Sequence, residues 1–274
     1  MTELQKCEWE ILRKALQILH REKLTYFLVC GSALGAVKYG GFIPWDDDVD
    51  IALPRDDYEK FLQCVKECET EDFTLQNYRY DLNVPFFYSK IRCGTTTYVE
   101  KASAHLNINH GVYIDVFPLD GYPGDKRKAR VFEGKKRIFR RLLSAVFLRE
   151  SAWKNAVTWP IRLLVKPFLN PLVGAYDCHL SQYPVADSEY ICNHGNWQGK
   201  VEYAPREQYG EGTWAIFEGL KVRVPERYDE YLTQKYGDWR AELPPERQVG
   251  HHYYEIMDLT KPYTEYIPHK NSLT

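Results

Sequence analysis

Hydrophobic and polar positions follow two different periods along the first forty residues, and each change of period marks an expected element. Apolar residues recur at helical spacing over 2–22, which predicts an amphipathic helix. An apolar, partly β-branched run over 26–30 predicts a strand that stops at Gly31 and Ser32, and helical character returns over 33–39. The chain is therefore expected to open with a helix, a strand, a Gly-Ser turn and a second helix.

The same patterns divide the rest of the chain into short strands and helices. We expect strands over 49–53, 73–78, 86–93, 111–117, 214–217 and 221–224, and helices over 55–69, 126–175 and 226–236. Pro54 and Pro118 are expected to end the strands that precede them. This mixture predicts an α+β fold built on a mixed β-sheet flanked by helices.

Length and composition allow one large domain or one domain with a sizeable insertion. The chain has 274 residues, of which 44% are hydrophobic and 27% charged. We expect a core over 1–125, a basic helical insertion over 126–175, and a C-terminal α+β portion over 176–274 that completes the core and contributes to a site for an acceptor molecule.

The charge of the chain is unevenly distributed. The formal net charge is −2, yet residues 126–166 hold 13 Lys and Arg against two Glu, a net charge of +11. A block of this kind indicates an anionic partner: a membrane surface, a polyanionic polymer or nucleic acid.

Cysteine usage and hydropathy bear on the cellular compartment. The seven cysteines are an odd number without a C-x-x-C pair, and the first residues lack the apolar core of a signal peptide. No uncharged apolar run reaches the roughly 20 residues that a membrane-spanning helix requires. We therefore expect a reduced, cytoplasmic protein.

Residues 30–53 carry the most informative chemistry. Between a strand and a helix, the backbone N–H groups of Gly31 and Ser32 can receive a phosphate oxygen, and the serine adds a hydroxyl donor. Asp48 and Asp50 flank Val49 in the next strand, so their carboxylates leave the same face. Two such carboxylates suit a hard cation such as Mg²⁺.

The acidic run at 46–48 has two readings. Such runs are usually solvated surface loops, but Asp50 alternates with apolar neighbours, and an unpaired carboxylate facing inward would be costly. We therefore expect Asp48 and Asp50 to hold Mg²⁺ or another divalent cation. Asp115 repeats the apolar-acid-apolar pattern and is the expected third carboxylate; the alternative is an edge-strand Asp that faces solvent. We expect Asp120 to be a turn residue.

Other polar and aromatic side chains give weaker indications. Lys90 and Arg92 alternate along a strand and can neutralise phosphates from one face, unless that strand is a solvated edge. His194, His251 and His252 have no zinc-like spacing with cysteine and are expected to be structural or minor substrate contacts. Four aromatic residues could cage a quaternary ammonium, although core packing is the plainer role for each: Trp45, Tyr113, Trp197 and Tyr203.

These motifs resemble a known family. GSALGAVKYGGFIPWDDDVDIALPRDDYEKF and HGVYIDVFPLDGYP are similar to the LicD family of phosphocholine transferases, within the polymerase-beta-like nucleotidyltransferase superfamily, and FEGLKVRVPERYDEYLTQKYGDW extends the similarity. The resemblance implies a nucleotidyltransferase-like sheet. It also implies that Gly31 and Ser32 hold the donor diphosphate, that Asp48, Asp50 and Asp115 bind one or two divalent metals, and that Asp46 assists.

The function implied by the resemblance is metal-dependent transfer of phosphocholine, or a similar phospho-alcohol, from a CDP-linked donor such as CDP-choline. The expected acceptor is a hydroxyl of a cell-surface glycan, a lipopolysaccharide or a teichoic-acid precursor, which can be lipid-linked, and CMP leaves. Asp115 is the preferred general base because it is separate from Asp48 and Asp50. Two alternatives stay open: nucleotidyl transfer onto a small molecule or nucleic acid, and a degenerate, purely binding member of the fold.

The basic helices over 126–175 also carry large apolar side chains, such as Phe139, Trp159 and Phe168. They can lie on an anionic membrane, such as the inner face of the cell membrane, or form a helical subdomain whose basic face is exposed to solvent. The mixture of basic and aliphatic residues argues against a nucleic-acid partner, because single-strand binders interleave basic with aromatic residues.

Overall fold

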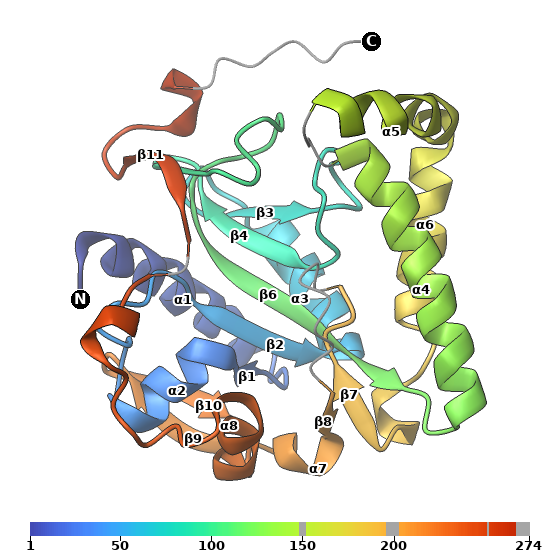
Figure 1. Ribbon diagram of the computed structural model, residues 1–274. Helices are drawn as coiled ribbons and strands as arrows, with labels where there is room; N and C mark the ends of the chain where they lie inside the picture. Colours follow the sequence, from blue (N-terminus) through green and yellow to red (C-terminus); the bar gives the residue numbers. More distant parts are fainter. Residues whose placement is uncertain (148–151, 196–202, 251, 267–274) are drawn as a thin grey trace.

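A central mixed sheet organises the molecule (Figure 1). The computed structural model describes residues 1–147, 152–195, 203–250 and 252–266. The main path of the sheet runs β1 (Phe27–Leu28), β2 (Asp50–Pro54), β6 (Val112–Tyr122), β4 (Ser89–Cys93), β3 (Thr74–Asn77). β2 and β6 are parallel, whereas the other neighbours on this path are antiparallel. The prediction of an α+β fold with a mixed sheet flanked by helices is confirmed.

β6 is longer than its sequence predicts. Pro118 was expected to end this strand, but β6 continues to Tyr122 and pairs there with β7 (Tyr190–Cys192), which in turn pairs with β8 (Ala204–Pro205). The missing N–H of Pro118 is tolerated because the ladder to β4 ends at Val116 and the ladder to β7 begins at Asp120. The expectation that Asp120 is a turn residue is therefore wrong.

Asp120 instead lies buried within β6. Its carboxylate accepts hydrogen bonds from the Arg55 guanidinium, with Nε at 2.8 Å and Nη2 at 2.5 Å. Burial raises the pKa of Asp120, although Arg55 acts to lower it. Asp120 is thus a paired structural carboxylate that connects β6 to the start of α3 (Arg55–Glu67).

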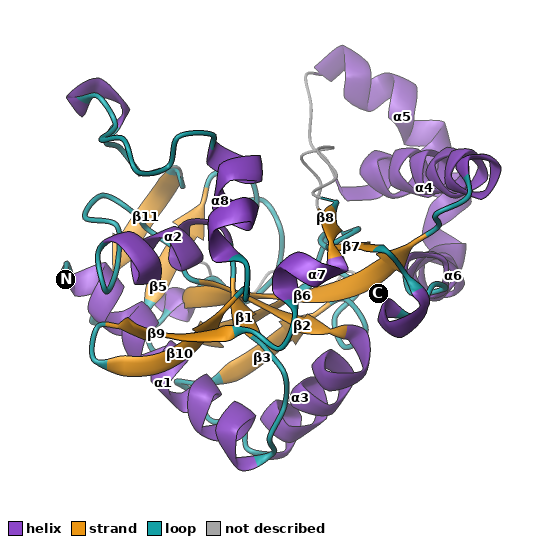
Figure 2. Ribbon diagram, turned by 90° about the horizontal axis from the view of Figure 1, so that it is seen from below, coloured by secondary structure: helices purple, strands orange, loops and turns teal. Residues whose placement is uncertain are grey.

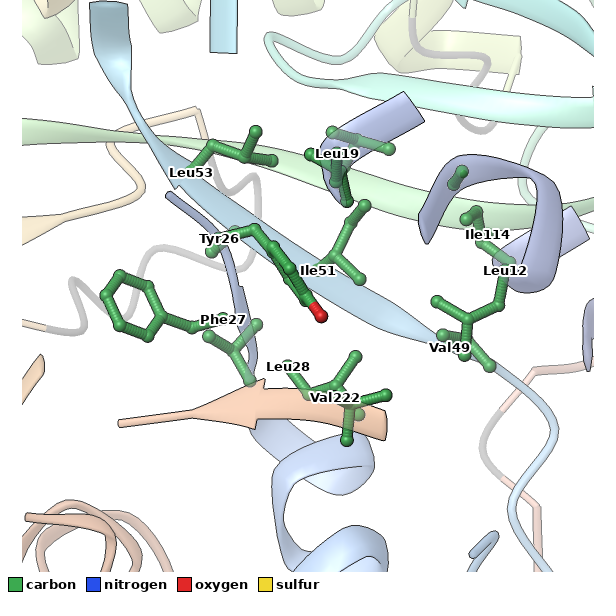
Figure 3. Packing of buried hydrophobic residues seen from close by; sticks show 14 of the residues in the cluster. Leu12, Leu19, Tyr26, Phe27, Leu28, Val49, Ile51, Leu53, Ile114 and Val222 are labelled. Carbon is green, nitrogen blue, oxygen red and sulfur yellow. The ribbon is translucent and has the colours of Figure 1, made fainter. Parts of the chain in front are cut away.

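One face of the sheet is apolar and covered by α1 (Glu3–Arg21) and α3. Alternate residues of β2 and its approach, among them Val49, Ile51 and Leu53, point into this core and meet Leu12 and Leu19 of α1 (Figure 3). The period-2 alternation places Asp50 and Ala52 on the opposite face.

The opposite face is covered by α2 (Cys30–Lys38), α7 (Arg206–Tyr209) and α8 (Tyr228–Tyr236), as Figure 2 shows. α2 starts at Cys30, so Gly31 and Ser32 form its first turn rather than a separate turn before it. The preceding strand is correspondingly short. The start of α2 therefore lies directly beside the start of β2.

Two small sheets flank the main one. β9 (Thr213–Phe217) and β10 (Leu220–Val224) form an antiparallel hairpin close to the predicted ranges. β5 (Thr97–Glu100) pairs with β11 (Tyr254–Asp258), a pairing that the sequence did not predict. The remaining short elements are 3₁₀ turns at Lys166–Phe168 (η1), Val185–Asp187 (η2), Pro245–Arg247 (η3) and Tyr263–Glu265 (η4).

Three helices lie together on one side of the molecule: α4 (Lys126–Phe147), α5 (Ala152–Val165) and α6 (Leu169–Leu180) (Figure 1). A second hydrophobic cluster holds α4 and α6 to the segment before β4, through residues such as Phe87, Leu143 and Tyr176. Across the described residues, every helix falls short of the length and apolarity that crossing a bilayer demands.

Candidate active site

A pocket of about 550 Å³ lies on the polar face of β2 and β6. Asp50 and Asp115 are register partners on these parallel strands, and both line the pocket floor although they are only 7% and 6% exposed. The next same-face pair, Ala52 and Phe117, continues the floor. The pocket therefore has an acidic end and an apolar end along the same two strands.

The loop before β2 brings three more carboxylates to the acidic end. One oxygen from each of Asp46, Asp47 and Asp48 can be chosen so that all three lie within 4.8 Å of one another. Asp48 lines the pocket together with Asp50 and Asp115. The side-chain amide of Gln5 holds this loop by donating to the carbonyl oxygens of Ile43 and Asp46. Among the predicted ligands, the structure thus gathers Asp48, Asp50 and Asp115 in one pocket and places Asp46 in the adjoining cluster.

Gly31 permits the close approach of Asp46 to α2. A Cβ atom at Gly31 would lie 2.6 Å from Oδ2 of Asp46, which is too close for a side chain there. The Asp46 carboxylate consequently lies against the first turn of α2, where the helix dipole favours negative charge.

Ser32 and Cys30 connect the start of α2 to its surroundings. Oγ of Ser32 accepts a hydrogen bond from the backbone N–H of Asp50 at 2.8 Å, which fixes the start of β2. The backbone N–H of Cys30 donates to the Tyr231 hydroxyl at 3.1 Å. Cys30 lines the pocket, and Gly31 and Ser32 follow it in the same turn. Neither residue of the predicted phosphate-binding pair, Gly31 or Ser32, lines the pocket itself.

Lys90 lies within the acidic end itself. It is the β4 register partner of Asp115, and its Nζ is 3.1 Å from Oδ1 of Asp115 and 3.5 Å from Oε1 of Glu100. The ammonium also lies over the ring of Tyr113, 3.2 Å from its centroid. Lys90 lines the pocket and balances part of its negative charge.

Arg92 has a different position from Lys90. Its side chain is fully buried, with Nε donating to Gln76 and Nη1 to the carbonyl oxygen of Gly111, both at 2.7 Å. It does not line the pocket, and its remaining contact with Glu100 is 3.3 Å. Arg92 is thus joined to the site through Glu100 and not by direct exposure to the pocket.

Burial raises the pKa values of three aspartates of the site, Asp46, Asp50 and Asp115. Burial and the neighbouring Asp48 raise the pKa of Asp46 to about 8 and raise that of Asp50 well above its usual range. Burial also raises the pKa of Asp115 to about 6, although Lys90 opposes the shift. Glu100 behaves oppositely: burial acts to raise its pKa, but Lys90 and Arg92 outweigh this and hold it at about 2.

Glu8 is a buried carboxyl that sequence reasoning missed. It is 2% exposed on α1, its Oε2 has no hydrogen-bond partner among the described residues, and burial followed by repulsion from Asp48 and Asp47 raises its pKa. Its position one turn after Gln5 in a helix gave no signal, because acidic residues are ordinary on helices.

The donor set fits a divalent metal ion. Carboxylate oxygens from two adjacent strands and one loop converge, and oxygen ligands are those that Mg²⁺ and Ca²⁺ prefer. The raised pKa values of Asp46 and Asp50 and the unpartnered oxygen of Glu8 show an excess of buried negative charge that a cation would relieve.

The C-terminal part of the chain closes the pocket. β11 pairs with β5 and so brings His252 and Tyr253 to the acidic end. Nε2 of His252 is 3.5 Å from Oδ2 of Asp48, and its Nδ1 is 2.9 Å from the Tyr113 hydroxyl. His252 thus lies within reach of a substrate in the pocket, whereas His251 lies outside the described residues.

The apolar end of the pocket is lined by aromatic residues that the sequence did not single out. Tyr209 and Tyr231 line it together with Phe117 and Leu119, and Tyr88 packs against Phe117 at 4.8 Å between ring centroids. None of the described residues suggested for an aromatic cage lines this pocket: Trp45, Tyr113 and Tyr203. Trp197 lies outside the described residues.

Comparisons with known proteins agree with the motifs. Residues 23–142 match the family described as LicD/FKTN/FKRP, nucleotidyltransferase domain. The chain is 27% identical over 254 residues to the lipopolysaccharide cholinephosphotransferase LicD of Haemophilus influenzae, an alignment that covers 87% of this chain and 90% of that protein. It is also 25% identical over 115 residues to an uncharacterized protein of Rickettsia prowazekii, covering 42% of this chain and 40% of the other. The predicted resemblance to the LicD family is confirmed.

Proposed function

We propose that this protein is a LicD-family phosphotransferase that transfers phosphocholine, or a similar phospho-alcohol, from a CDP-linked donor to a hydroxyl of a cell-surface glycan or teichoic-acid precursor, with release of CMP. The observation that carries the proposal is the pairing of Asp50 with Asp115 on the floor of the pocket. A relative aligned over 87% of the chain is named for phosphocholine transfer to lipopolysaccharide, which supports the same acceptor class.

We propose a divalent cation, in practice Mg²⁺, held by Asp48, Asp50 and Asp115 with Asp46 beside them. Such an ion supplies charge stabilisation to phosphate oxygens in phosphoryl transfer. The proposal is supported by the clustering and burial of these carboxylates and by the raised pKa values of Asp46 and Asp50.

Asp115 is the proposed general base. The acceptor hydroxyl attacks phosphorus as its proton passes to a carboxylate oxygen of Asp115, and CMP departs with the electron pair of the broken P–O bond. Asp115 suits this role because it lies on a different strand from Asp50 and lines the pocket where the acceptor would enter. Lys90, at 3.1 Å, orients the carboxylate and keeps part of it ionised.

The donor diphosphate is proposed to lie between the start of α2 and Lys90. Gly31 and Ser32 provide the first turn of α2, whose N-terminal end attracts anions. Lys90 adds a positive charge to the lining of the pocket. Arg92 lies outside this lining and contacts Glu100, the carboxylate that Lys90 also contacts. The tyrosines at the apolar end, Tyr209 and Tyr231, would then lie beside the nucleoside or the alcohol of the donor.

We further propose that the sheet is of the nucleotidyltransferase type, as the description of the matching family suggests. Residues 1–125 and 176–274 would form the core, with 126–175 inserted. The return of β7 beside β6, after α6 and η2, supports this division because the helices are then preceded and followed by neighbouring strands. A nucleotide-linked donor and seven free cysteines favour the cytoplasm as the site of action.

A donor survey tests the proposed reaction. The protein is incubated with Mg²⁺ and a glycan acceptor, together with CDP-choline, CDP-ribitol, CDP-glycerol or CTP, and CMP and pyrophosphate are quantified. We expect CMP from at least one CDP-alcohol and no pyrophosphate from CTP. Pyrophosphate release from CTP would instead establish nucleotidyl transfer, and no product from any donor would contradict both reactions.

A further inference from the structure

The outer face of α5 and η1 exposes an unusual number of large apolar side chains. Leu164 is 73% exposed and Phe168 is 67% exposed. The other exposed members of this face are Trp159, Ile161 and Leu163. Surface helices of globular proteins normally turn such residues inward, and contiguous exposed apolar patches mark interaction sites.

The orientation of α5 accounts for this exposure. Arg162 is half-buried, and its Nε donates to the carbonyl oxygen of Ala145 in α4 at 3.0 Å. At about 100° per residue, Ile161, Leu163 and Leu164 lie roughly 100° to 160° around the helix from Arg162, whereas Trp159 lies roughly 60° from it. The α4–α5 contact therefore fixes the apolar face outward.

The electrostatic surroundings of this face are positive. Residues 151–176 contain no Asp or Glu, and Lys166 is exposed between Leu164 and Phe168. The solvent side of α4 adds exposed cations, with the exposed apolar residues Val131 and Ile138 among them. These cations are Lys126, Arg127, Lys128, Arg130, Lys135, Arg137 and Arg141.

We propose that the outer face of α5 and η1, which we call the docking face (Trp159, Ile161, Leu163, Leu164 and Phe168), inserts into the headgroup region of an anionic phospholipid bilayer. Exposed apolar residues enter the boundary with the acyl chains, and neighbouring Lys and Arg contact anionic headgroups. A second copy of the chain is a poorer occupant, because a symmetric contact through this face would bring two strongly basic α4 helices together.

This inference does not depend on the proposed reaction. It concerns where the molecule resides, and it holds for any substrate in the pocket. Combined with a lipid-linked acceptor, it would place the pocket and its acceptor at the same surface.

Vesicle co-sedimentation of the full chain tests the proposal. Vesicles of phosphatidylcholine alone are compared with vesicles that also contain phosphatidylglycerol, at low and at high salt. The apolar contribution is removed with the double variant Leu163→Ser/Leu164→Ser. The matched control is Ile216→Ser/Val249→Ser, which removes apolar side chains of similar exposure elsewhere. The charge contribution is removed with Arg137→Gln/Arg141→Gln.

We expect binding to anionic vesicles that weakens at high salt, and at least a tenfold loss of the partition coefficient in the Leu163/Leu164 variant. The Arg137/Arg141 variant should bind more weakly with a smaller salt dependence, and the control should bind as the parent does. Light scattering on all variants reports the oligomeric mass. Absence of binding to anionic vesicles, or equal losses in the variant and its control, would overturn the proposal. A parent dimer that becomes monomeric in the Leu163/Leu164 variant would do so too, because a second copy would then cover the face.

Discussion

The missing side chain of Gly31 decides where one carboxylate of the site lies. Oδ2 of Asp46 occupies space that any Cβ at residue 31 would need, at 2.6 Å. The glycine is therefore required by the approach of Asp46 and not by an unusual backbone angle. This explains why a glycine begins the motif in a helix, where it costs about 1 kcal/mol relative to alanine.

Gly31→Ala should displace Asp46 and weaken the binding of the cation. We expect the Mg²⁺ concentration for half-maximal CMP release to rise roughly tenfold, since changes next to metal ligands commonly cost 10–100-fold in affinity. The measurement is a Mg²⁺ titration of initial rates. Gly134→Ala is the matched control, because a Cβ there meets no atom within 4 Å and should leave the Mg²⁺ requirement unchanged. An unchanged requirement in Gly31→Ala would exclude Asp46 from the metal site.

The sequence could predict Asp50 and Asp115 because each interrupts an apolar strand, and that signal is local. It could not predict Glu8, whose acidic side chain is unremarkable on an amphipathic helix until α1 packs beside the 46–48 loop. Nor could it predict His252, which reaches Asp48 only through the pairing of β11 with β5. Side chains brought in by tertiary pairing leave no local pattern.

At the scale of elements, β6 and its neighbours show where local rules were insufficient. Pro118 predicts the end of the strand, because proline lacks the N–H of a strand residue. β6 nevertheless continues, because Pro118 lies in the gap between its ladders to β4 and β7. The helices α1 and α3 and the strand β2 followed from periodicity, but the parallel pairing of β2 with β6 did not. β5 and β11 were missed because each is short and finds its partner about 150 residues away in the chain.

The β6–β7 junction also contains a buried histidine with a testable pH effect. Nε2 of His194 lies 3.0 Å from the carbonyl oxygen of Gly121, so the neutral ring carries its proton on Nε2 and donates it. Burial lowers the pKa of His194 to about 3. Between pH 7 and pH 5 the unfolded chain protonates this residue and the folded chain does not, so the free energy of unfolding falls by about 2 kcal/mol from this group.

His194→Gln removes this contribution while keeping a donor near Gly121. We expect the variant to be less stable at pH 7 but to lose about 2 kcal/mol less than the parent between pH 7 and pH 5. Urea unfolding at the two pH values measures both changes. The same pH dependence in parent and variant would show that His194 is protonated equally in the folded and unfolded states.

At the scale of the whole molecule, the family match and the pocket extend over different parts of the chain. The match spans residues 23–142, yet Asn193, Tyr209, Tyr231, His252 and Tyr253 line the same pocket as Asp50 and Asp115. The C-terminal part therefore shapes the site. Charge is also distributed unevenly over the whole molecule, because residues 126–166 are strongly basic and the rest of the chain is acidic.

The central claim is that Asp50 and Asp115 perform the chemistry. The most direct test is the rate of CMP release by Asp50→Asn and Asp115→Asn, with the exposed Asp56→Asn on α3 as control. We expect a loss of roughly 10³-fold in kcat for both site variants and a near-parental rate for the control. Because burial raises the pKa of both carboxyls, the neutral Asn should leave folding stability equal or higher. Folded Asp50→Asn or Asp115→Asn protein with a near-parental rate would contradict the account.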